Sequence, residues 1–495
     1  MEILYKSTRG DGSTVTASQA ILKGLSDDGG LFVPTQIPPL KASLEDLSKM
    51  DYKGVAYEVM SAFLSDFTEE ELKSCIENAY DSKFDTTEIA PLVKEDGIYF
   101  MELYHGATIA FKDMALSILP HLMTTAAKKN NIKNEIVILT ATSGDTGKAA
   151  LAGFAGVPNT KIIVFYPKGG VSRIQELQMV TQKGDNTFVC GVKGNFDDCQ
   201  SAVKKMFNDP ALKAHLAENG YQFSSANSIN IGRLVPQVAY YVWAYSRLVS
   251  NGEIKAGDEI NFVVPTGNFG NILAGYYAKL MGLPVNKLIC ASNENRVLYD
   301  FFESGIYNRN REFILTSSPS MDILISSNLE RLIYKVVGES EEENRRLMKD
   351  LSEKGVYELP EESKPLLGDF CGGFASEEEN FTGIKYLYDN FGYVIDTHTG
   401  VAYSAYKKYK EGTGDNLPAV IVSTASPYKF SRSVMGSIDK KYEEEDDFEL
   451  IKELNVISKR PIPQAIKDIM DADIRHKCVC KREDMEQAVK GFLAI

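Results

Sequence analysis

The chain has 495 residues, of which 44% are hydrophobic and 25% charged, and its formal net charge is −14. A chain of this length exceeds one ordinary hydrophobic core, so we expect two to four domains. The composition is that of a soluble globular protein. It contains no basic arm and no cluster of lysines and arginines, which argues against nucleic acid as the main partner.

The first residues, MEILYKSTRGDGS, lack the apolar core of a signal peptide, and no stretch reaches the roughly 18 apolar residues that cross a membrane. Seven cysteines are scattered along the chain, several of them in apolar, strand-like runs. This usage indicates buried thiols in a reducing cytoplasm, without a disulfide framework. Cys478 and Cys480 lie near His476, but no second ligand pair follows at zinc spacing, so we interpret them as structural thiols.

In chain order, residues 1–95 alternate loops with amphipathic runs and predict an N-terminal helical layer. From about residue 135, apolar strand-like runs alternate with helical patterns, which predicts an α/β fold with a mostly parallel sheet and helices on both faces. Ligands in such folds bind at the carboxyl ends of the strands. The expected strands are 135–141, 161–167, 187–192, 221–227, 259–265, 287–292 and 419–426.

Lys112 lies among small and apolar residues in the segment 105–116. Apolar residues recur around it at helical spacing, so we expect it near a helix start, just before Pro120 strains the helix. A lysine in a partly desolvated pocket near a positive helix end loses some preference for its ammonium form. Lys112 is therefore a candidate Schiff-base former. The alternative is a surface lysine whose stem packs on Phe111.

A glycine-rich turn, Gly267-Asn268-Phe269-Gly270-Asn271, joins an expected strand to an expected helix. Its glycines let the backbone approach a ligand, and the free N–H groups of the helix start suit a phosphate. The turn is neither a dinucleotide fingerprint nor a Walker A loop. A generic connection is the alternative.

Two other turns end strands with hydroxyl groups. Ser143 and Thr146 in the turn 142–147 could receive a carboxylate at a helix start, although a simple capping turn is also compatible. Thr424, in the run Ser423–Ser426, could hydrogen-bond a ring nitrogen without forcing its protonation. It could equally be an ordinary turn residue.

A second anion site is suggested by Arg233, which could clamp a phosphate bidentately, and by Lys168 as a point charge. A surface position is the alternative for each. Taken together, an amine, a phosphate cradle, a carboxylate turn and a ring-nitrogen partner are what an enzyme that uses pyridoxal phosphate as an electron sink needs.

At these residues the sequence resembles the threonine synthases of the longer bacterial and fungal type, which are pyridoxal phosphate enzymes of fold type II. The resemblance covers nearly the whole chain, in order. It is carried by STRG (7–10), GLSDDGGLFVP (24–34), HGATIAFKD (105–113), TSGDTG (142–147), PKGGVSRIQELQM (167–179), NSINIGR (227–233), GNFGN (267–271), STAS (423–426) and PIPQAI (461–466).

The resemblance implies the tryptophan-synthase-β-like fold of these enzymes, with two parallel-sheet αβα domains and an N-terminal helical layer. We expect an N-terminal helical domain at 1–95 and a large cofactor-binding domain at 96–130 and 226–495. A smaller αβα domain at 131–225 would be nested within the large one. Both a monomer and a homodimer are compatible with it.

The resemblance also assigns roles. Lys112 would hold the cofactor as a Schiff base and then act as the base that moves protons. The remaining assignments fall into three groups. The cofactor phosphate would be held by Gly267, Asn268, Phe269, Gly270 and Asn271, and the pyridine nitrogen by Thr424. Ser143, Asp145 and Thr146 would face the substrate carboxylate or the cofactor, and Asn227, Arg233 and Lys168 the substrate phosphate.

The implied reaction converts O-phospho-L-homoserine and water to L-threonine and phosphate by γ-elimination and β-addition of water, the last step of threonine biosynthesis. A related phospho-lyase would instead release 2-oxobutyrate, ammonia and phosphate. A serine or threonine dehydratase fits less well because it needs no second phosphate site. A catalytically dead binding protein is also conceivable, but the intact Lys112 speaks against it.

Overall fold

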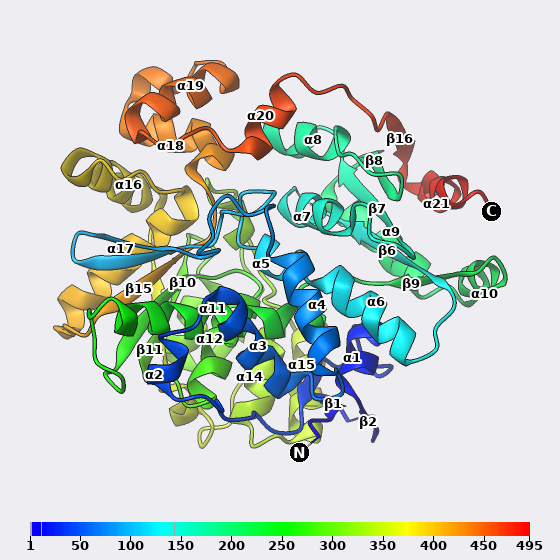
Figure 1. Cartoon of the computed structure of the whole chain (residues 1–495), viewed down its shortest axis with the longest axis horizontal. Helices are drawn as coiled ribbons and strands as arrows, with labels where there is room; N and C mark the ends of the chain where they lie inside the picture. The colour runs from blue at the N-terminus through cyan, green and yellow to red at the C-terminus, as the bar shows by residue number, and fades with distance from the viewer. Residues whose placement is uncertain (1, 11, 143) are drawn as a thin grey trace.

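The computed structural model of the chain describes residues 2–10, 12–142 and 144–495, so Ser143 lies outside the described residues. Two layered bodies stand side by side in Figure 1, a larger one on the left and a smaller one on the right. Each has a central sheet covered by helices on both faces. This is the expected α/β architecture. Among the described residues, no helix has the length and apolar character needed to cross a membrane.

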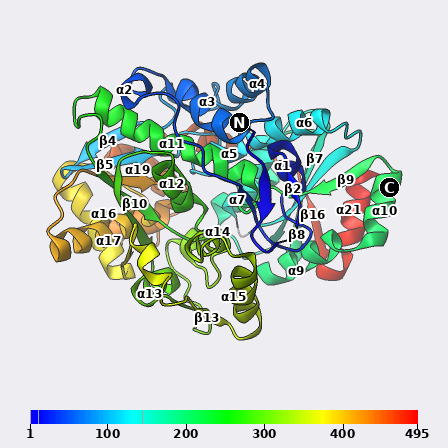
Figure 2. The same cartoon turned by 90° about the horizontal axis from the view of Figure 1, so that it is seen from below.

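The larger sheet has six strands, and all neighbouring pairs are parallel except β4–β5. Alternate residues of β10 enter different cores: Phe262 packs with the core of α11 and α12, and Val263 with the core of α16 and α17. Figure 2 shows β10 between these helices. Burial on both faces explains why the central strands are continuous apolar runs. The strands, in sheet order, are β14 (Phe370–Phe374), β11 (Val285–Ser292), β10 (Ile260–Pro265), β15 (Ala419–Ser423), β5 (Ile98–Glu102) and β4 (Leu92–Glu95). The helices are α11 (Ile231–Ser250), α12 (Gly270–Leu280), α16 (Glu377–Phe391) and α17 (Thr397–Thr413).

The smaller sheet has five parallel strands. Helices α9 (Phe196–Phe207) and α21 (Met485–Leu493) pack on one face, while α7 (Asp145–Phe154) contributes to the core on the other. The strands, in sheet order, are β16 (Cys478–Lys481), β8 (Thr187–Lys193), β7 (Thr160–Pro167), β6 (Glu135–Ala141) and β9 (Tyr221–Ser224).

The edge strand β16 lies in the smaller sheet, paired with β8, whereas the expected domain division places all of 226–495 in the large domain. The chain leaves α20 (Gln464–Met470) and crosses the top of Figure 1 to reach the smaller body, where it adds β16 and α21. The C-terminal residues therefore pack on the smaller sheet. A four-residue strand offers too little pattern to reveal its partner in the sequence.

The N-terminal 95 residues are only partly helical. They contain α1 (Ala17–Lys23), α2 (Leu44–Leu47), α3 (Tyr52–Phe63) and α4 (Glu69–Ala79). They also form an antiparallel three-stranded sheet in the order β2 (Thr14–Val15), β1 (Tyr5–Ser7) and β3 (Phe32–Pro34). In addition, β4 joins the larger sheet. The helices of the expected N-terminal layer are thus accompanied by short strands, which the sequence did not predict because strands of two to four residues leave no periodic signal.

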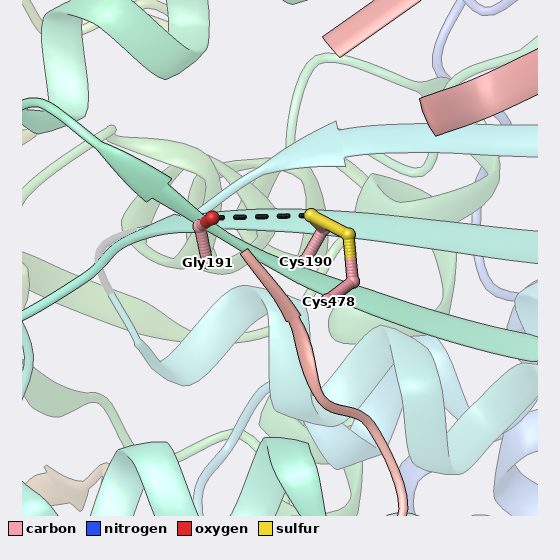
Figure 3. Close-up of a disulfide and its surroundings, with 3 residues drawn as sticks. All are labelled: Cys190, Gly191 and Cys478. Atoms are coloured by element: carbon pink, nitrogen blue, oxygen red, sulfur yellow. Dashed lines mark hydrogen bonds between the residues drawn. A yellow bond between two sulfur atoms is a disulfide. The ribbon is translucent and has the colours of Figure 1, made fainter. Parts of the chain in front are cut away.

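Cys190 and Cys478 form a disulfide, which corrects the expectation of unpaired thiols throughout (Figure 3). The two residues are 288 positions apart in sequence but directly opposite each other in the parallel register of β8 and β16. The other five cysteines are free thiols. No group of three or more metal-binding side chains is found in the described part of the chain.

Candidate active site

Lys112 directly precedes the short helix α5 (Asp113–Leu116), as the sequence predicts. The helix ends before Pro120, which instead lies in the first turn of α6 (Leu119–Lys129). Proline is tolerated there because that N–H has no intrahelical acceptor. The Phe111 N–H donates to the carbonyl of Thr424 at 2.8 Å, just beyond the end of β15. This hydrogen bond fixes Lys112 at the carboxyl end of the larger sheet.

The Lys112 amine is buried and has polar neighbours. Its Nζ donates to Ser320 Oγ at 3.4 Å and lies 3.6 Å from Asp145 Oδ2. The Nζ also lies over the Phe111 ring, 4.8 Å from its centroid. Because the side chain is buried, the alternative of a surface lysine packed on Phe111 is wrong. Burial lowers the pKa of Lys112, Asp145 opposes that effect, and the charges of Lys429 and Arg233 reinforce it. The net result is an amine that gives up its proton more readily than an ordinary lysine.

Asp145 is the first residue of α7, the helix that packs on one face of the smaller sheet. Its Oδ1 accepts from Gln175 Nε2 at 3.0 Å and lies 3.2 Å from Lys429 Nζ, and its Oδ2 accepts from Ser320 Oγ at 3.2 Å. Burial alone would raise the pKa of Asp145, but the charges of Lys429 and Lys112 outweigh it and hold the pKa well below its usual range. Asp145 is therefore ionised.

The turn Gly267–Asn271 connects β10 to α12 and runs beside Ser320. A Cβ on Gly267 would lie 2.3 Å from the carbonyl oxygen of Ser320, so only glycine fits. Phe269 has a φ of 63°, in the left-handed region, and α12 begins at Gly270. The first N–H groups of a helix have no intrahelical acceptors, so this turn presents donors suited to an anion.

Asn271 adds a side-chain donor to this turn. Its Oδ1 accepts from the hydroxyls of Tyr240 and Tyr241 at 2.6 and 2.7 Å. Its Nδ2 is buried and has no hydrogen-bond partner among the described residues. A buried, unpartnered donor is costly unless a ligand meets it. The turn therefore fits a phosphate group.

Thr424 follows β15 and is buried. The neighbouring Ser423 hydroxyl is paired with Thr399 Oγ1 at 2.9 Å, and the Ser426 N–H donates to the carbonyl of Ile109 at 3.1 Å. The run 423–426 thus offers hydroxyl groups and no carboxylate. A hydroxyl suits a ring nitrogen that stays largely neutral.

Arg233, the third residue of α11, is buried. Its Nη1 donates to the carbonyl of Ala226 at 2.9 Å, and its Nε has no partner among the described residues. Burial lowers the pKa of Arg233 to about 10. The charge of Arg233 also lowers the pKa of Lys112.

The other predicted substrate contacts are less buried. Asn227 is exposed and accepts from Thr140 Oγ1 at 3.5 Å near the end of β6, and Thr146, on α7, is half-buried. Lys168 is exposed, pairs with Glu176, and lines a separate cavity of about 250 Å³ with His476 and other residues. The contacts of Lys168 are therefore not with the group of residues around the Lys112 amine, here called the Lys112 cluster.

Sequence reasoning missed three residues of this cluster: Lys429, Ser320 and His398. The Ser320 N–H donates to His398 Nε2 at 3.2 Å, so the ring proton is on Nδ1, which contacts Asp396 Oδ2 at 2.7 Å. Lys429 is only five residues beyond Thr424 and could have been noticed. Ser320 lies in a short 3₁₀ turn, Pro319–Met321, which leaves no periodic pattern in the sequence.

Family models cover nearly all of the chain. A "Threonine synthase N terminus" model matches residues 4–80, and a "Threonine synthase, C-terminal" model matches 399–492. Between them, the model of the "Pyridoxal-phosphate dependent enzyme" family matches residues 84–425. The chain belongs to the threonine synthase family. It is thus a pyridoxal phosphate-dependent enzyme of fold type II, as the motifs predict.

Individual members of the threonine synthase family agree with this. The threonine synthase of Schizosaccharomyces pombe is 37% identical over 465 residues, covering 88% of this chain and 89% of that one. The crystal structure of threonine synthase from Brucella melitensis with bound pyridoxal phosphate has a TM-score of 0.88 at 33% identity and matches both chains in full. Human threonine synthase-like 1 is 39% identical over 440 residues, and these cover 86% of this chain but only 58% of that one.

Proposed function

We propose that this enzyme converts O-phospho-L-homoserine and water to L-threonine and phosphate. The observation that carries the proposal is a buried amine of lowered pKa, Lys112, with two sites for anions near it. The turn Gly267–Asn271 suits one phosphate and the buried Arg233 suits another. A phosphorylated cofactor acting on a phosphorylated substrate needs both.

Bound pyridoxal phosphate supplies an electron sink that stabilises negative charge on the substrate carbons next to the amino group. Lys112 holds the cofactor through its amine and, once displaced, moves the proton at substrate Cα and then a proton at Cβ. Phosphate leaves from Cγ, and water adds at Cβ. The lowered pKa of Lys112 serves both tasks, because only the neutral amine is a nucleophile or a base.

We assign the cofactor phosphate to the turn Gly267–Asn271 and the pyridine nitrogen to Thr424. The N-terminus of α7, with Thr146 and Ser143, suits the substrate carboxylate because its N–H groups attract anions. Asp145 is ionised and would repel that carboxylate, so we assign it to the Lys112 amine instead.

The substrate phosphate is assigned to Arg233 and Asn227. Lys168 is the least supported candidate, because Glu176 already neutralises it. We further propose a cytoplasmic enzyme, either monomeric or homodimeric, because substrate and product are small, water-soluble metabolites. Cell fractionation and light scattering test the two statements separately.

The first experiment is an absorbance spectrum of the purified protein before and after addition of O-phosphohomoserine, with phosphate and threonine assayed. We expect a cofactor band that shifts and equimolar phosphate and threonine. In Lys112→Ala both the covalently attached cofactor and turnover should be lost. A band that ignores this substrate would refute the substrate assignment and leave the cofactor chemistry intact.

The related phospho-lyase reaction is the second candidate. It starts from the same substrate and needs the same two anion sites. The product decides between the two, since 2-oxobutyrate and ammonia in place of threonine would assign the lyase reaction.

A further inference from the structure

Lys429 is a second buried lysine next to the Lys112 amine. It lies in the 3₁₀ turn Pro427–Phe430, which follows the run that contains Thr424, and its side chain is completely buried. Its Nζ donates to the carbonyl of Thr108 at 3.0 Å and lies 3.2 Å from Asp145 Oδ1. Lys429 thus joins the loop before Lys112, the end of the larger sheet and the first residue of α7.

The two oxygens of Asp145 serve different cations. Oδ1 faces Lys429 and Gln175, whereas Oδ2 faces Lys112 and the Ser320 hydroxyl. The distance to Lys429, 3.2 Å, is shorter than the 3.6 Å to Lys112. Asp145 therefore keeps one ammonium partner when the other moves away.

Other charged groups surround this pair. The charge of Arg233, on α11, lowers the pKa of Lys112, and the ring of His398, on α17, accepts from the Ser320 N–H at 3.2 Å. Asp113 accepts hydrogen bonds from the Thr108 N–H and hydroxyl at 2.8 and 2.6 Å. Burial raises the pKa of Asp113, and the charge of Lys429 partly offsets that rise. Lys148, on α7, is also close enough to Lys429 for their charges to interact. Asp145 is thus the carboxylate that Lys112 and Lys429 both contact, and Asp113 is a second carboxyl group near Lys429.

We propose that Lys429 is a positioning residue for the Lys112 amine, holding Asp145 in place while Lys112 is engaged with the cofactor or substrate. The proposal rests on the role of Lys112 in the proposed function. A buried carboxylate that loses its only cation becomes a costly isolated charge. Lys429 and Gln175 remain as its partners throughout.

A measurable consequence concerns the protonation of Lys112. The charge of Lys429 repels the Lys112 ammonium, whereas the charge of Asp145 attracts it. Removing the Lys429 charge should therefore make Lys112 harder to deprotonate, and removing the Asp145 charge should make it easier. Opposite shifts from two substitutions at one ion pair are not expected from general structural damage.

The test measures covalent attachment of pyridoxal phosphate to Lys112 as a function of pH. Full-length protein freed of cofactor is mixed with pyridoxal phosphate and reduced with borohydride, and the modified lysine is quantified by peptide mass spectrometry. For Lys429→Met we expect the midpoint of attachment to rise by about one pH unit, and for Asp145→Asn to fall by a similar amount. Lys429→Arg, which keeps the positive charge, should restore the wild-type midpoint.

Lys148→Met is the matched control, because Lys148 is a half-buried lysine on α7 whose Nζ donates to Gln182 Oε1 at 2.6 Å. Its midpoint should not change. Unchanged midpoints in folded Lys429→Met overturn the proposal. If that variant does not fold, an unchanged midpoint in Asp145→Asn overturns it equally. Attachment that persists in Lys112→Ala would instead refute the assigned role of Lys112 and so the proposed function.

Discussion

Asn328 holds the carbonyl oxygen of Asn268 with two hydrogen bonds, one from its backbone N–H and one from its side-chain Nδ2, both at 3.0 Å. Asn328 is in turn held by Arg331, whose Nη1 donates to Asn328 Oδ1. Arg331 is completely buried and also donates to the carbonyl of Phe32 at 2.9 Å. The N-terminal layer thus supports the turn that we assign to the cofactor phosphate.

Substitution of Asn328 should therefore weaken cofactor binding without removing any group that contacts the cofactor. Asn328→Ala loses the side-chain bond to Asn268 and removes the side-chain acceptor of Arg331 Nη1, so we expect about a tenfold weaker affinity for pyridoxal phosphate. Fluorescence titration of the cofactor-free protein measures this. Ser327→Ala is the control, because its half-buried side chain makes a single hydrogen bond among the described residues, a long one of 3.4 Å to Asn268 Oδ1. Equal losses in both variants would contradict the explanation.

Substitutions of Arg233 and Lys168, the two candidate cations for the substrate phosphate, should have different effects on KM. Arg233→Ala should raise the KM for O-phosphohomoserine by about tenfold or more, because a charge-assisted contact is lost from a buried site. Lys168→Ala should change it by less than about twofold, since Lys168 already pairs with Glu176. Steady-state kinetics with both variants, at saturating cofactor, provide the measurement. A larger effect at Lys168 would reverse the assignment.

His105 should make stability depend on pH. Burial lowers the pKa of His105, but contacts of Nδ1 with Asp85 at 2.5 Å and of Nε2 with Glu102 at 3.0 Å outweigh it and raise the pKa to about 9 from 6.5. Protonated His105 therefore stabilises the folded state. This contribution is fully present below pH 6.5, the unfolded-state pKa, and is lost as the pH rises through about 9, the folded-state pKa.

We expect His105→Gln to lower the free energy of unfolding by about 1–3 kcal/mol at pH 6. The lower end of this range applies if water screens the ion pair with Asp85, whose side chain is exposed. At pH 9.5 the difference between the two proteins should have largely disappeared. Denaturant titrations at the two pH values measure it. A difference that does not change with pH would show that the ring contributes by packing alone.

Cys190 and Cys478 should be recovered as one linked peptide from protein purified without reductant, with the other five cysteines free. Reduction should loosen residues 478–495, because the crosslink fastens β16 to β8. Hydrogen exchange of β16 and α21, measured with and without dithiothreitol, tests this. In a reducing compartment the pair would stand as two thiols, and Cys190→Ser should then exchange like the reduced protein. Identical exchange with and without reductant would refute the tethering role.

Much of the fold could be read from the sequence because its central strands are buried on both faces. The apolar runs 135–141 and 259–265 predict strands, and the structure has β6 at Glu135–Ala141 and β10 at Ile260–Pro265. Continuous apolar runs bounded by glycine-rich turns are strong local signals. By contrast β2, of two residues, and β16, of four, depend on strands elsewhere in the chain, and no local pattern specifies them.

The sequence by itself determined which chemistry the molecule carries: a lysine before a helix, a glycine-rich phosphate turn and hydroxyls at a strand end are short contiguous motifs, set by local backbone geometry. Only the tertiary structure decided which side chains surround Lys112. Asp145, Ser320 and Lys429 come from segments up to 317 positions away (429 − 112 = 317) and meet through the packing of two sheets. The apolar surroundings of Lys112 in the sequence already indicate that burial lowers its pKa. The charges of Asp145, Lys429 and Arg233 also act on it, and these could not be read from its neighbours in sequence, because electrostatic effects depend on distance in space and not on separation along the chain.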